Sequence, residues 1–82
     1  MDAAQMRAKA AAAVQGVEET DNQIRLALDK LDQEVMRLMT LSDHQGIANA
    51  ISNLQNAKAK LEEALSVTAQ AISHINSYTP HL

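Results

Sequence analysis

The chain has 82 residues and a formal charge of −3, so it can form one small domain. Apolar residues make up 46% of the sequence, but fifteen residues are alanine and only one, Tyr78, is aromatic. With no cysteine, two glycines and one proline, the composition excludes a disulfide scaffold and argues against a sandwich or barrel of short strands. No run of about 20 apolar residues is present, so no membrane span is expected.

The first predicted helix covers residues 3–40. Asp2 and Gln5 have the spacing of a capping box, in which Asp2 is the N-cap residue. No strong stop signal follows before Thr40, although Gly16 is an interior weak point that costs about 1 kcal/mol relative to alanine. The alanine-rich start of this helix lacks the cationic face and bulky aromatic residues of helices that bind membrane surfaces, which makes membrane-surface binding the weakest alternative.

The second predicted helix covers residues 43–77 and follows a break at residues 40–46. Ser42, Gln45 and Gly46 are the predicted turn and cap residues, because Ser42 and Gln45 form a second candidate capping box. Pro80 prevents continuation of this helix. We therefore expect a helical hairpin domain at residues 1–77 and a frayed tail at residues 78–82.

Apolar residues recur in alternating steps of three and four along both helices. This heptad pattern predicts two helices that pack along a continuous seam. A short turn makes neighbouring helices antiparallel, so the predicted fold is all-α, an antiparallel two-helix hairpin. The predicted packing residues are Val17, Ile24, Leu28, Leu31, Val35, Leu38, Ile47, Ile51, Leu54, Leu61, Leu65, Ile72 and Ile75.

Three polar residues interrupt the seam: Asp21, Lys58 and Thr68. Pairing the helices across the turn places Val17 opposite Thr68 and Asp21 opposite Leu65. In this register Asp21 and Lys58 are about one heptad, roughly 10 Å, apart and form no buried salt bridge. Lys58 can extend its ammonium group to solvent. Asp21 is expected at the edge of the seam, or as a residue that sets register against another chain.

An alanine recurs every seventh residue beside the seam of the second helix. This alanine column allows a second helix to approach closely, and it consists of Ala50, Ala57, Ala64 and Ala71. A hairpin buries only one stripe per helix, and chains of this size are rarely stable on that alone. A second copy is the simplest partner, because a twofold dimer uses the same patch on both subunits. We therefore expect a homodimer that forms a four-helix bundle, and a helical protein partner is a further expectation.

No catalytic, cofactor-binding or metal-binding site is expected from the sequence. Thiol chemistry and cysteine-ligated zinc need cysteines, and the chain has none. In a hairpin His44 and His74 lie about 45 Å apart, from the rise per residue of a helix. The run Ser42-Asp43-His44 contains three triad residue types, but neighbours in sequence rarely have triad geometry. The protein is therefore predicted to be non-enzymatic.

The seven basic residues are spread along the chain, and most have an acidic residue three or four positions away. Such pairs share a helix face and support the helix by roughly 0.2–0.5 kcal/mol each. Nucleic-acid-binding domains usually carry a basic stripe, so this pattern argues against nucleic-acid binding. The plasmid Rop dimer is a similar hairpin bundle that binds RNA, and a Rop-like activity is therefore one alternative.

The segment His44-Gln45-Gly46, the apolar positions that follow it and the late Tyr78 resemble the WXG-type small secreted helical hairpins of actinobacteria and firmicutes. That group includes the early-secreted-antigen family. His44 stands where the family has tryptophan, and residues 79–82 lack the acidic residue that the family carries three positions after its tyrosine. The resemblance implies a hairpin that dimerises and is exported by type VII secretion.

The main prediction is a non-enzymatic interaction or assembly protein that acts by coiled-coil-type packing with itself and with a partner helix. A WXG-like type VII secretion substrate, or a helper of such a substrate, is the second alternative beside the Rop-like one. Residues 1–5 do not have the basic and leucine-rich regions of a Sec signal peptide. The expected location is cytoplasmic, and the alternative is export without a cleaved signal peptide.

Overall fold

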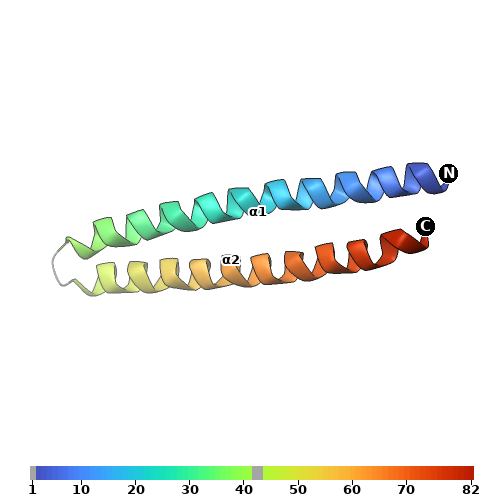
Figure 1. The fold of residues 1–82 in the computed structure, drawn as a ribbon. Coiled ribbons are helices and arrows are strands. Elements are labelled where there is room, and N and C mark those ends of the chain that lie inside the picture. Colours follow the sequence, from blue (N-terminus) through green and yellow to red (C-terminus); the bar gives the residue numbers. More distant parts are fainter. Residues whose placement is uncertain (1, 42–43) are drawn as a thin grey trace.

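The computed structural model describes residues 2–41 and 44–82. These residues form two long helices, α1 (Ala3–Met39) and α2 (Gln45–Tyr78), followed by a short 3₁₀ helix, η1 (Thr79–His81). The two long helices lie side by side and antiparallel, and both termini lie at the same end (Figure 1). The hairpin measures 62 × 15 × 14 Å. The predicted all-α hairpin is confirmed.

The first helix begins at the capping box that the sequence predicts. The Asp2 carboxylate accepts a hydrogen bond from the Gln5 backbone N–H at 2.8 Å, and the Gln5 side chain accepts one from the Asp2 N–H at 3.3 Å. These bonds satisfy two of the N–H groups that lack partners at a helix start. The helix continues through Gly16 without a break and ends at Met39, with Thr40 as its C-cap residue.

The second helix begins with a cap that the sequence did not indicate. His44 is the N-cap residue, and its Nδ1 atom accepts a hydrogen bond from the Gly46 backbone N–H at 3.1 Å. Gln45 is the first helical residue, and its side-chain amide donates to the Asn49 side chain at 3.1 Å. Ser42, the predicted cap residue, lies outside the described residues. The helix therefore starts two residues later than expected.

The C-terminal end of the chain also differs from the expected boundary. Tyr78 is the last residue of α2, and the chain then continues as the 3₁₀ helix η1. Pro80 is compatible with this short element, because proline is tolerated in the first turn of a helix. Leu82 is half-buried, and its carbonyl oxygen accepts a hydrogen bond from the Arg7 guanidinium at 3.4 Å. Residues 78–82 thus extend the hairpin.

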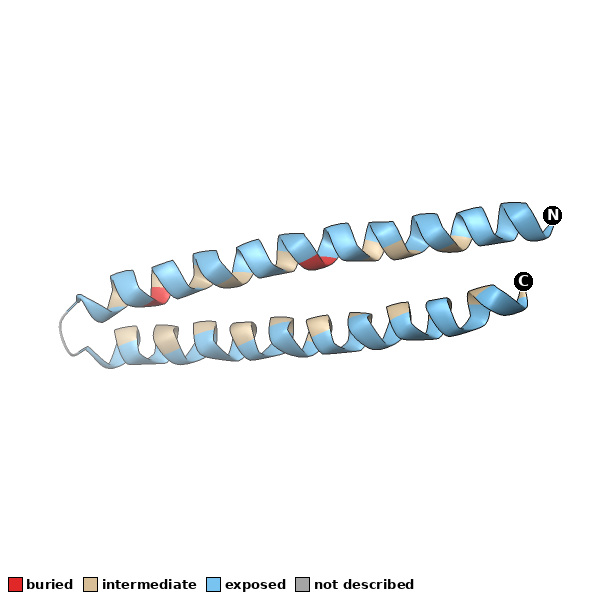
Figure 2. Cartoon of the chain, in the orientation of Figure 1, coloured by how far each residue is buried: buried red, intermediate tan, exposed pale blue. Residues whose placement is uncertain are grey.

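Burial follows the facing sides of the two helices (Figure 2). Among the described residues, Val35 at 4% exposure is the only buried apolar residue, and Asp21 at 6% is the only buried polar one. No described side chain is fully buried. All other predicted packing residues are half-buried: Val17, Ile24, Leu28, Leu31, Leu38, Ile47, Ile51, Leu54, Leu61, Leu65, Ile72 and Ile75. The hairpin therefore has a seam but no deep core.

Candidate interaction surface

A polar pair lies at the middle of the seam. The Thr68 hydroxyl donates a hydrogen bond of 2.7 Å to the Asp21 carboxylate, and this bond joins α2 to α1. Burial of a carboxylate without a partner is costly, whereas a charge-assisted hydrogen bond offsets part of that cost. The pair therefore favours the one alignment of the helices that brings these two groups together.

The position of Asp21 corrects two expectations from the sequence. Asp21 is buried inside the seam, whereas an edge position was expected. Thr68 lies opposite Asp21, whereas the predicted register placed it opposite Val17, so the helices are offset by about one turn. The physical reason is the carboxylate, since the predicted register would have buried it against Leu65 without a hydroxyl donor.

The third polar seam residue, Lys58, forms an ion pair across the hairpin with Asp32 of α1. The Lys58 side chain is mostly buried, whereas half of the Asp32 side chain is exposed. The aliphatic stem of Lys58 thus occupies a seam position while its ammonium group reaches a carboxylate at the surface, as expected for a long amphipathic side chain. The heptad pattern identifies Lys58 as a polar seam residue. It does not identify Asp32 as the partner of Lys58, because Asp32 lies outside the seam.

A groove of about 460 Å³ runs between α1 and α2 at the end that carries the termini. Met6, Ala10 and Ala13 of α1 line one side, and Ile75 and Tyr78 of α2 line the other. Lys9, His74, Thr79 and Leu82 complete the lining. Most of these side chains are apolar, so the groove offers a contact surface of the kind that another apolar side chain can fill.

A second groove, of about 410 Å³, lies near the middle of the hairpin and is polar. Glu18, Asn22 and Arg25 of α1 line it together with Ala69 of α2. Arg25 donates a hydrogen bond of 3.1 Å to the Asn22 side chain. Asp21, Leu65 and Ile72 also line this groove.

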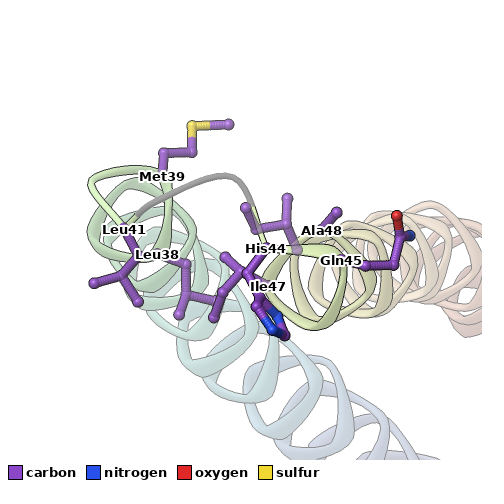
Figure 3. A pocket seen from close by; sticks show the side chains of 8 residues that line it. Leu38, Met39, Leu41, His44, Gln45, Ile47 and Ala48 are labelled. Carbon is purple, nitrogen blue, oxygen red and sulfur yellow. The ribbon is translucent and has the colours of Figure 1, made fainter.

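The third groove, of about 340 Å³, lies where the two helices meet the turn (Figure 3). Leu38 and Met39 from the end of α1 line it with Ile47 and Ala48 from the start of α2. Met39 and Ala48 point to the same side of the hairpin (Figure 3). Leu41, His44, Gln45 and Ile51 complete its lining.

The three grooves show which residues of α1 and α2 lie on the same long side of the hairpin. Burial repeats every seven residues along both helices, so residues seven positions apart lie on the same side. The terminal groove places Met6 and Ala13 beside Tyr78, which follows Ala71, the last residue of the alanine column, by seven residues. We name this side the alanine edge: Met6, Ala13, Thr20, Ala27 and Glu34 of α1 with Ala50, Ala57, Ala64, Ala71 and Tyr78 of α2.

The opposite side follows from the other two grooves in the same way. The middle groove joins Glu18 and Arg25 to Ala69, and the turn groove joins Met39 to Ala48. We name this side the charged edge: Ala4, Ala11, Glu18, Arg25, Asp32 and Met39 of α1 with Ala48, Gln55, Glu62, Ala69 and Asn76 of α2. Four residues of the charged edge carry a formal charge, against Glu34 alone on the alanine edge.

The predicted alanine column lies along the alanine edge. Ala50, Ala57 and Ala64 are half-buried beside the seam, and Ala71 is exposed. Large apolar side chains are also exposed among the described residues: Met6, Leu26, Met36, Met39, Leu41, Val67 and Tyr78. Of these, Met6 and Tyr78 belong to the alanine edge and Met39 to the charged edge.

The described residues contain no group of three or more side chains that could hold a metal ion. No helix among residues 2–41 and 44–82 is long and apolar enough to span a membrane. Comparison with protein-family models, with curated proteins and with solved structures finds no match to this chain.

Proposed function

We propose that this chain is an interaction and assembly protein that acts without catalysis, by packing its helices against a second copy of itself and against a helical partner. The observation that carries the proposal is the seam that one hairpin leaves half-buried. Its apolar residues repeat over the whole length of both helices, yet Val35 alone is buried among the described apolar residues. A further layer of helix would complete this burial.

The accessible surface of the hairpin gives the size of the missing contact. It amounts to 6025 Å². A compact monomer of 8.9 kDa has about 4,800 Å², so each chain exposes about 1,200 Å² in excess. Burial of that excess on two chains gives about 2,400 Å², which lies in the range of permanent dimer interfaces. The surface that one chain leaves uncovered is therefore the amount that a second copy would bury.

The shape of the molecule supports the same proposal. Its radius of gyration is 18.7 Å. A compact domain of 82 residues would have a radius of gyration of only about 12 Å, so this hairpin is much more elongated. A second hairpin laid along the first doubles the thickness without adding length, and thus forms the four-helix bundle that the heptad pattern favours.

Light scattering coupled to size-exclusion chromatography tests this proposal. At micromolar concentration we expect a mass of twice 8.9 kDa, because the dimer is the form that buries the seam. A mass of 8.9 kDa together with full helicity by circular dichroism would refute self-association. A filter-binding assay with RNA separates the Rop-like alternative, since RNA binding would weaken steeply with added salt.

A further inference from the structure

The two long edges of the hairpin differ in their capacity to accept another helix. The alanine edge carries one formal charge, Glu34, whose carboxylate already lies 3.7 Å from the Arg37 guanidinium. The charged edge carries four formal charges: Glu18, Arg25 and Asp32, which follow one another every seven residues on α1, and Glu62 on α2. Asp32 is paired with Lys58, but a helix docked on this edge would still remove four charges from water instead of one. Removal of charges from water is costly, so an extended helix contact is favoured on the alanine edge.

Small side chains make close approach possible along the alanine edge. Alanine side chains end at Cβ, so a second helix can lie near the α2 backbone at every seventh residue of the column. At the end of the edge, Tyr78 is 63% exposed beside the apolar terminal groove. Large aromatic side chains at the rim of an apolar groove are typical of protein contact sites, because they contribute a large contact area.

The area of one edge matches what a stable dimer needs. The hairpin is 62 Å long and about 15 Å wide, so one side of it spans more than the roughly 800 Å² per partner of a standard interface. In a twofold dimer both copies present the same edge. Contact of one alanine edge with the other then brings the alanines of both subunits together, with Glu34 as the one charged residue that each edge contributes.

We propose that the alanine edge is the docking surface for a second copy of this chain, and that the charged edge stays in solvent. This inference rests on the proposed self-association and adds the surface that mediates it. Substitutions on the two edges should therefore affect dimerisation differently, even where the substituted residues are only two positions apart on the same helix.

A matched pair of double variants tests the inference. Ala13→Lys with Ala71→Lys places two charges on the alanine edge, whereas Ala11→Lys with Ala69→Lys places them on the charged edge. All four alanines are exposed in the hairpin, so neither variant disturbs the intramolecular seam. We expect the first variant to have the mass of one chain by light scattering and the second to keep twice that mass.

Three outcomes would overturn the assignment. In the first, the alanine-edge variant keeps twice the mass of one chain. In the second, only the charged-edge variant dissociates, and in the third both variants dissociate. A parent chain that is itself a monomer would instead refute the self-association proposal. The two failures are therefore distinguishable in the same experiment.

Alkylation of single cysteines provides a readout that does not depend on a variant's ability to fold as a monomer. The natural chain has no cysteine, so Ala71→Cys and Ala69→Cys each introduce one thiol. We expect a maleimide to react roughly tenfold more slowly at position 71 than at position 69, because reaction there requires opening of the dimer. Equal rates at the two positions in the doubled-mass species would overturn the proposal.

Discussion

Replacement of Thr68 by valine tests whether the hydrogen bond to Asp21 sets the stability of the seam. Valine keeps the shape of threonine, so Thr68→Val creates no cavity and removes only the hydroxyl. Asp21 is 6% exposed and then loses its donor. A hydrogen bond to a charged group contributes about 1.5–3 kcal/mol, so we expect a loss of about 2 kcal/mol in the free energy of unfolding.

Urea unfolding followed by circular dichroism at 222 nm measures this loss. For a chain of this size the denaturant slope is about 1 kcal/mol per molar urea, so the midpoint should fall by about 2 M. Thr79→Val is the matched control. The Thr79 hydroxyl donates at 2.7 Å to the Ile75 carbonyl near the end of α2. The single proton of the Thr68 hydroxyl is shared between Asp21 and a similar local acceptor, the Leu65 carbonyl at 3.0 Å. Thr79→Val therefore removes a local bond of the same kind and leaves the interhelical bond of Thr68 in place.

Equal losses for Thr68→Val and Thr79→Val would refute the reasoning. A second comparison strengthens the test. The double variant Asp21→Leu, Thr68→Val replaces both polar groups by apolar ones and should be more stable than Thr68→Val alone, because no unpaired carboxylate is left in the seam. All variants are compared at one protein concentration, since self-association makes the midpoint depend on it.

Three further predictions, which use four substitutions, are tested by the same unfolding assay. Leu31→Ala should lower the free energy of unfolding by at least about 2 kcal/mol. Its control, Leu26→Ala, changes a side chain that is 69% exposed and should alter the free energy of unfolding by less than about 0.5 kcal/mol. Equal losses for the two variants would mean that the seam is misassigned. Gly16→Ala should raise the free energy of unfolding by about 0.5–1 kcal/mol, because a Cβ atom at this helical position meets nothing within 4 Å beyond the adjoining residues of its own helix, and a decrease would contradict the helix there. Asp32→Asn should lower it by under about 1 kcal/mol, and this loss should shrink in 1 M salt; a loss unaffected by salt would show that the pair with Lys58 is not the cause.

The helices could be predicted from the sequence because their signals are local. The capping box at Asp2 and the steps of three and four between apolar residues depend only on helix geometry. The turn was predicted for the same reason, as a cluster of cap residues before Gly46. These features give the number of helices and their antiparallel order without knowledge of any contact between them.

The register of the two helices could not be predicted in this way. A shift of one helical turn keeps apolar residues facing each other, so the heptad pattern does not distinguish the alternatives. The partner of Asp21 decides between them, and Thr68 lies 47 residues away in the sequence. The His44 cap was missed because histidine is not among the preferred N-cap residues. The two edges likewise depend on how α1 and α2 are placed relative to each other.

The concentration dependence of unfolding tests most directly whether one hairpin leaves its seam incomplete. If the folded state is a dimer that unfolds to two chains, a hundredfold rise in protein concentration raises the apparent stability per dimer by about 2.7 kcal/mol. We therefore expect the urea midpoint to rise by more than about 1 M over that range. A midpoint that is identical at all concentrations, with a single cooperative transition, would contradict the account.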